Sequence, residues 1–239
     1  MSMEISLIVS FWNKDRHRYD INHKTTKQNN LFLLHYIKSM EEIIKDSLAK
    51  SMSYQDYRTL MNQLVLNEST TGNDKSEDMV AFTKLNDQRM KRWDKTIKVT
   101  DSVKVELANI ETKQTWLVLT ESWCGDAAHV VPVFNKLSEL NPNINFRVVL
   151  RDDNEALMNL FLTNGGKAIP KLIIIDDASN EVINTFGPRP SEATKLVVDY
   201  KAKHGQITPE IKEELQQWYN TDKGQGVIRE VMNLLTVTA

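Results

Sequence analysis

The second half of the sequence predicts an α/β fold on the strength of three observations. The run Trp116-Leu117-Val118-Leu119 is continuously apolar, which is typical of a strand buried on both faces. Residues 144–150 carry apolar side chains at every even position, which predicts a second strand. Two further apolar runs, 172–175 and 182–186, flank a polar segment, 176–180, with the composition and length of a hairpin loop.

Helical patterns lie between these strands, at 126–140 and 153–163, and a last one covers 193–200. Asn164-Gly165-Gly166 gives the second of these helices a natural C-terminal stop. The order is therefore strand, helix, strand, helix, strand, hairpin, strand, helix. It predicts a mixed sheet flanked by helices, with parallel strands first and an antiparallel pair last.

We divide the 239 residues into four parts. Residues 1–30 form a leader, because 13–30 contain too few apolar residues to bury a core. Residues 31–110 form a helical N-terminal extension, residues 111–205 the α/β domain, and residues 206–239 a helical C-terminal tail. Within the extension, helical spacing or composition marks three segments: 33–48, 54–66 and about 76–93.

Charge and cysteine content exclude several classes of protein. Lys and Arg total 30 against 32 Asp and Glu, so the net charge of −2 gives no general reason to bind nucleic acid or an anionic membrane. The single cysteine, Cys124, excludes an intramolecular disulfide and favours a reducing compartment. We therefore expect a cytoplasmic protein that binds neither nucleic acid nor a membrane.

Two segments leave alternatives open. The apolar run at 5–12 is too short for a membrane helix, which needs roughly 18 residues, and no Lys or Arg precedes it as in a secretory signal. It is a core strand, a partner-binding segment or an upstream start that adds little. Residues 84–98 hold six Lys or Arg against two Asp, and the solvated face of an amphipathic helix explains them better than a basic binding patch.

Cys124 is the first candidate for chemistry, because it stands where the first predicted strand gives way to a helix. The free N–H groups and positive dipole end of a helix stabilise a thiolate, which is the reactive form of cysteine. Pro132 lies inside the same predicted helix, where a kink is expected. Ile169-Pro170 begins the third predicted strand, which fits a sharp turn such as a cis X–Pro bond.

These features together resemble thioredoxin. The match covers 116–204 and consists of Trp123-Cys124-Gly125-Asp126, Pro132, the Ile169-Pro170 pair and Gly187 after the last strand. The resemblance implies a thioredoxin-like fold with a cis-proline, Pro170, beside Cys124. More narrowly, Trp-Cys-Gly-Asp-Ala-Ala followed by Arg-Asp-Asp-Asn and Gly-Gly-Lys-Ala-Ile-Pro is similar to a bacterial branch whose members carry a helical N-terminal extension.

Two departures from the family matter for function. Its second, resolving cysteine falls at Ala127, so this chain cannot release a mixed disulfide by forming an internal one. The buried acid that assists proton transfer in thioredoxins falls at Val118. Both losses argue against the ordinary dithiol cycle.

Several neighbours of the thiol have competing interpretations. Asp126 caps the helix or tunes Cys124, and its charge favours the neutral thiol. His129 lies five residues along the helix, a rotation of about 140°, so we expect packing rather than a Cys–His dyad. Arg151 and Lys167 are candidates for recognising a small thiol, against pairing of Arg151 with adjacent acids as the simpler explanation.

Two hypotheses for function follow. In the first, a monothiol redox protein uses Cys124 to attack a disulfide, and an external thiol resolves the mixed disulfide; Trp123, Gly125, Asp126, Ile169 and Pro170 line the groove. Its partners would be a protein disulfide or a low-molecular-weight thiol, with no cofactor and no metal. In the second, the chain is a redox-inactive thioredoxin-fold binding module.

Overall fold

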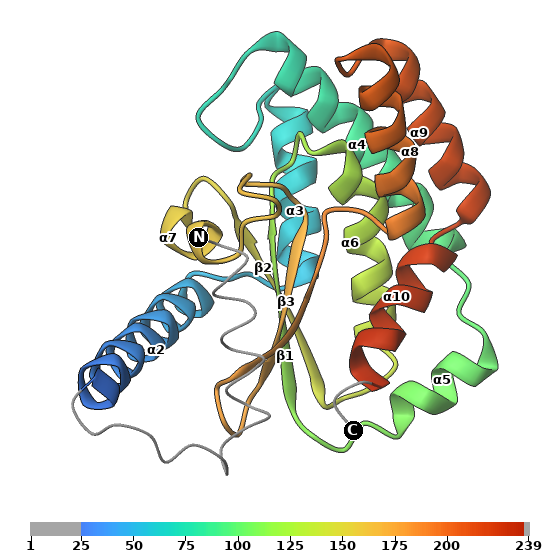
Figure 1. Ribbon diagram of the computed structural model, residues 1–239. Coiled ribbons are helices and arrows are strands. Elements are labelled where there is room, and N and C mark those ends of the chain that lie inside the picture. The colour runs from blue at the N-terminus through green and yellow to red at the C-terminus, as the bar shows by residue number, and fades with distance from the viewer. Residues whose placement is uncertain (1–24, 237–239) are drawn as a thin grey trace.

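Four strands form one mixed sheet at the centre of the computed structural model, which describes residues 25–236 (Figure 1). They are β1 (Gln114–Thr120), β2 (Ile144–Leu150), β3 (Lys171–Asp176) and β4 (Val182–Phe186), in the spatial order β2-β1-β3-β4. β1 runs parallel to β2, while β3 is antiparallel to both β1 and β4. A mixed sheet with flanking helices confirms the predicted fold class.

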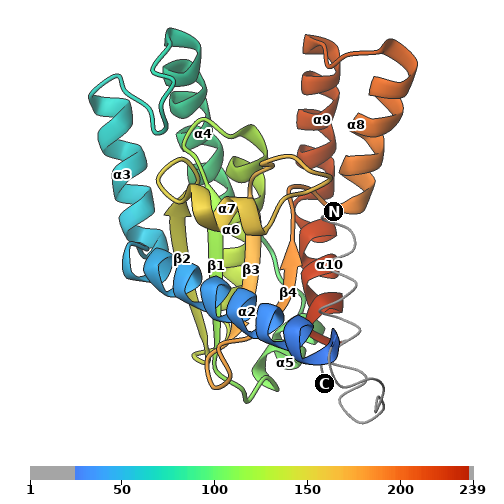
Figure 2. The ribbon, with the colours of Figure 1, turned by 60° about the vertical axis from the view of Figure 1, so that its left-hand side comes forward.

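Nine helices surround the sheet in the described part of the chain. Figure 1 shows α6 and α10 against one face, and α2 and α7 on the other. In Figure 2 the pairs α3–α4 and α8–α9 rise past the same end of the sheet. The helices are α2 (Thr25–Ala49), α3 (Tyr54–Leu66), α4 (Glu77–Thr96), α5 (Asp101–Ala108), α6 (Gly125–Ser138), α7 (Glu155–Leu160), α8 (Ser191–His204), α9 (Pro209–Asp222) and α10 (Gln225–Thr236).

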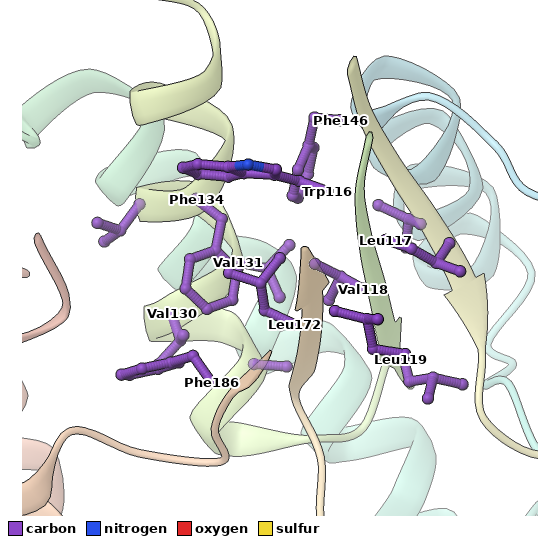
Figure 3. Close-up of a cluster of buried hydrophobic side chains, with 14 of the residues drawn as sticks. Trp116, Leu117, Val118, Leu119, Val130, Val131, Phe134, Phe146, Leu172 and Phe186 are labelled. Carbon is purple, nitrogen blue, oxygen red and sulfur yellow. The ribbon is translucent and has the colours of Figure 1, made fainter. Parts of the chain in front are cut away.

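The main core lies between β1, β3 and α6 (Figure 3). Every residue of β1 is buried, as its continuous apolar run predicts. From α6, Phe134 meets Phe186 edge to face, with ring centroids 5.6 Å apart. Burial of such side chains is the main favourable contribution to folding. The core therefore fixes α6, and with it the N-cap residue Cys124, against the sheet.

Local signals explain how the helical extension is built. α3 begins at a capping box, in which the Ser53 hydroxyl accepts from the Asp56 N–H while the Asp56 carboxylate accepts from the Ser53 N–H. Thr100 caps α5, an eight-residue helix that the sequence patterns do not predict. Such a short helix shows little more than two turns of periodicity.

Two boundaries differ from the predictions. The helix predicted at 153–163 is only α7, because Thr163 and Gly166 exchange two backbone hydrogen bonds around a turn that ends the helical path early. α2 begins at Thr25 and so includes the last six residues assigned to the leader. The apolar run at 5–12 lies outside the described residues.

No helix within residues 25–236 is long and apolar enough to cross a membrane.

Candidate functional site

Cys124 occupies the N-cap position of α6, directly after the loop that follows β1. Its thiol donates a hydrogen bond to the Ile169 carbonyl, with 3.3 Å between sulfur and oxygen. The next peptide bond, Ile169–Pro170, is cis and leads into β3. The structure therefore brings together two motifs that lie 45 residues apart in the sequence.

The Cys124 thiol is buried, and the whole residue is only 7% exposed. Burial raises the pKa of the thiol to about 12, and the negative charge of Asp126 acts in the same direction. The backbone N–H groups of Ala127 and Asp126 and the Arg189 guanidinium lower this pKa, but by less. The resting thiol is therefore protonated at neutral pH, consistent with its role as a hydrogen-bond donor.

The Asp126 carboxylate is held from two sides. Arg189 contacts both of its oxygens, at 2.9 Å and 2.7 Å, and the Tyr219 hydroxyl donates to Oδ1 at 2.9 Å. Burial nevertheless raises the pKa of Asp126 above its usual value. Asp126 lies in the first turn of α6, and Cys124 holds the N-cap position. Its charge acts to raise the pKa of Cys124, and whether Asp126 tunes the reactivity of the thiol stays a prediction.

Trp123 and Gly125 flank the cysteine and are both partly exposed. The Arg151 guanidinium lies over the Trp123 ring, 4.9 Å from its centroid. Gly72, in the loop between α3 and α4, approaches so closely that a Cβ there would lie 3.1 Å from the Trp123 indole nitrogen. The helical extension thus forms one wall of the site.

The two cations predicted to recognise a thiol ligand, Arg151 and Lys167, line one cavity of about 370 Å³. Each is already paired: Arg151 Nε lies 2.7 Å from the Asp152 carboxylate, and Lys167 Nζ lies 2.5 Å from that of Glu155. For Arg151, pairing with an adjacent acid is the simpler of the two explanations predicted from the sequence. Neither charge is free to bind an anion without releasing its partner.

Glu121 is a buried acid of the site that was not predicted from the sequence. Its Oε1 accepts from the Asp152 backbone N–H at 2.8 Å, whereas Oε2 has no hydrogen-bond partner among the described residues. Burial raises its pKa. Val118, the position where the family's acid falls, is a fully buried core residue. The sequence signal was an acidic residue within three positions of the cysteine, directly after an apolar strand.

His129 packs away from the thiol, as the rotation along α6 predicts. Its Nδ1 accepts from the Trp93 indole at 2.8 Å, its Nε2 lies 3.0 Å from Gln216 Oε1, and its ring stacks on Tyr219. Because Nδ1 accepts, the proton is on Nε2. Within residues 25–236, no group of His, Cys, Asp and Glu is arranged to hold a metal ion.

Three further residues at the site were not singled out from the sequence: Arg189, Tyr219 and Arg89. Arg189 follows β4, and Tyr219 comes from α9 in the C-terminal tail. Arg89 comes from α4, inside the run of six cations at 84–98. The other five of these cations are exposed, as expected for a solvated helix face, while Arg89 is half-buried.

A mixed sheet, a cysteine at the start of the helix that follows β1 and a cis-proline beside its sulfur define a thioredoxin-like protein. A family model described as thioredoxin matches residues 72–204, which is more than half of the chain. The chain therefore belongs to the thioredoxin family.

Two solved structures are similar to this chain. A protein of unknown function from Pseudomonas aeruginosa is 20% identical, over 66% of this chain and 91% of its own, with a TM-score of 0.49. An HIV epitope-scaffold is 17% identical, over 79% of this chain and all of its own, with a TM-score of 0.50. At 17% identity, the likeness to the epitope-scaffold bears on the fold alone. No curated protein matches the chain.

Proposed function

We propose that the protein carries out thiol–disulfide exchange through Cys124 as its only thiol. The observation that carries this proposal is the contact between the Cys124 sulfur and the Ile169 carbonyl, at the start of α6 and directly before Pro170. This arrangement leaves the sulfur between a helix N-terminus and the cis Ile169–Pro170 peptide. Ile169 and Pro170 are buried, as Cys124 is, so a disulfide-containing chain or small molecule that docks along them must displace this cover to meet the sulfur.

The reaction begins with loss of the thiol proton. The Cys124 thiolate attacks one sulfur of the disulfide, a mixed disulfide forms, and the other sulfur leaves as a thiolate that takes up a proton. The N–H groups of Asp126 and Ala127 and the charge of Arg189 stabilise the attacking thiolate. An external thiol then attacks the mixed disulfide and releases Cys124, because Ala127 stands where the family has its resolving cysteine.

The same proposal includes the branch of the family, the cellular compartment and the partner. The Trp-Cys-Gly-Asp-Ala-Ala segment at 123–128 supports membership of a bacterial branch of the family. A single reduced cysteine fits the cytoplasm, where thiols are kept reduced. The partner is a protein disulfide or a low-molecular-weight thiol.

A second candidate function is a redox-inactive binding module that keeps the thioredoxin groove. The burial of Cys124 and the rise of its pKa to about 12 favour this candidate, because a protonated, covered thiol is a poor nucleophile. In this case the groove beside Pro170, the helical N-terminal extension and the helical C-terminal tail would hold a partner. Cys124 would serve only as a packed side chain.

Reaction of the full chain with a small neutral disulfide, hydroxyethyl disulfide, separates the two. Exchange predicts a mixed disulfide on the native protein, detected by intact mass and reversed by added thiol. Cys124→Ser should give no adduct and an unchanged circular dichroism spectrum. A native chain that forms no adduct while the urea-unfolded chain does would remove the redox proposal and leave the binding module.

A further inference from the structure

The Arg89 guanidinium lies against the residue that follows the reactive cysteine. Its Nη1 is 3.7 Å from the position that a Cβ on Gly125 would take. The same nitrogen donates to Asn86 Oδ1 at 3.1 Å, and the Asn86 amide donates to the Ser122 carbonyl at 2.9 Å. Arg89 is therefore linked to the Cys124 loop through Asn86, although it comes from the helical extension.

Arg89 differs from the other cations of the site in having no acid of its own. Within the described residues no carboxylate lies within ion-pair distance of it, whereas Arg151, Lys167 and Arg189 each have a partner. The charge of Asp126 does act on Arg89, but both Asp126 oxygens are already bound by other groups.

The charge summed over Arg89, Arg189 and Asp126 is consequently positive. Arg89 and Arg189 share the single carboxylate of Asp126, and the neutral thiol adds no charge. Partial burial and the neighbouring Arg92 both lower the pKa of Arg89, so its charge is held at a cost that Asp126 only partly offsets. An anion placed on the remaining guanidinium donors would relieve this cost, since guanidinium and carboxylate match in charge and geometry.

We propose that Arg89 binds the carboxylate of a small, carboxylate-bearing disulfide or thiol that exchanges with Cys124. This inference rests on the proposed function and specifies its substrate class. Because the Arg89 guanidinium lies near Gly125, the residue after Cys124, the carboxylate must lie within a few bonds of the reacting sulfur. In the exchange, Cys124–SH and R–S–S–R give Cys124–S–S–R and R–SH, and Arg89 holds the carboxylate of the R group that stays attached.

The test compares two disulfide reagents on the full-length protein. One is the dianionic 5,5′-dithiobis(2-nitrobenzoate), and the other is the uncharged 2,2′-dithiodipyridine. We expect Arg89→Gln to slow the reaction with the dianion about tenfold, and the reaction with the neutral reagent by less than about twofold. The rate of Arg89→Lys with the dianion should fall between the rates of the wild type and of Arg89→Gln. Arg92→Gln is the matched control, because it removes an equal charge one turn along α4, where the side chain is exposed.

The possible outcomes separate the role of Arg89 from the proposed exchange function. An equal loss with both reagents, or an equal loss in Arg89→Gln and Arg92→Gln, would overturn the role of Arg89 and leave the exchange function standing. Failure of the wild-type protein to react with either reagent would overturn the proposed function and the recognition role together. The neutral-reagent rate also reports whether Arg89→Gln is folded at the site.

Discussion

Arg189 binds Asp126 through two contacts, Nε to Oδ1 at 2.9 Å and Nη2 to Oδ2 at 2.7 Å. This pair lies beside Cys124 and acts on it in opposite directions, because the carboxylate raises the pKa of the thiol and the guanidinium lowers it. The pair joins the end of β4 to the start of α6, so the reactivity of the thiol depends on a contact between distant parts of the chain.

Asp126→Asn should make Cys124 more reactive. Loss of the carboxylate charge removes one of the two causes that raise the thiol pKa, so more thiolate is present at any pH below that pKa. We expect alkylation by iodoacetamide at constant pH to become about three- to tenfold faster, since one pKa unit corresponds to a tenfold change in thiolate. Asp199→Asn, which removes an exposed acid of α8, should leave the rate unchanged. A slower reaction in Asp126→Asn would contradict this assignment.

Gly187→Ala should destabilise the fold and disturb the site. Gly187 has φ of +123°, and a Cβ there would lie 2.1 Å from the Pro170 carbonyl oxygen. Because that atom belongs to the backbone, we expect a loss of about 3 kcal/mol or more in the free energy of unfolding, measured with urea. Displacement of Pro170 should also speed alkylation of Cys124 in the folded protein.

Gly165→Ala is the control for the backbone conformation alone. Gly165 also has positive φ, +77°, but nothing lies within 4 Å of the added Cβ. Gly165→Ala should lower the free energy of unfolding by about 1 kcal/mol. Equal losses at the two glycines would mean that contact with Pro170 is not the cause.

The sequence predicts the sheet well, because each strand carries its own signal. The apolar run of β1 is fully buried, and the alternating pattern of β2 places Ile144, Phe146 and Val148 inside. α7 was predicted too long, because the turn closed by Thr163 and Gly166 depends on backbone hydrogen bonds that hydrophobic periodicity does not report.

The site is predicted only where its residues are close in sequence or belong to a family motif. Cys124 and Pro170 are of this kind. Tyr219 lies 93 residues from Asp126, and Arg89 lies on a helix whose pattern is that of an ordinary solvated face. Packing between helices and the sheet decides which side chains of α4 and α9 turn toward the cysteine. The sequence pattern of one helix does not report this packing, so these residues cannot be predicted from it.

Tyr219→Phe should destabilise the protein by about 1.5–3 kcal/mol. The hydroxyl donates to the buried Asp126 carboxylate, and hydrogen bonds to charged groups contribute more than neutral ones. Its ring stacking on His129 remains in the variant. Tyr200→Phe is the matched control, because its hydroxyl meets only the neutral Thr208 side chain, and it should lose about 1 kcal/mol or less. Urea unfolding of both variants tests whether α9 is held to the site by this contact.

His129 should make the stability of the protein depend on pH below about pH 6.5. Burial lowers the pKa of His129 to about 3, from an ordinary value of 6.5 in the unfolded chain. As the pH falls through this window, the unfolded chain binds a proton that the folded protein excludes, so the free energy of unfolding decreases. Between pH 7 and pH 5, this one group should lower the free energy of unfolding by about 2 kcal/mol.

His129→Gln keeps both a donor and an acceptor for Gln216 and Trp93 but does not titrate. Urea unfolding at the two pH values should therefore show a loss smaller by about 2 kcal/mol in the variant than in the wild type. Equal losses in the two proteins would mean that His129 is protonated in the folded state, and that the Trp93 indole does not donate to its Nδ1.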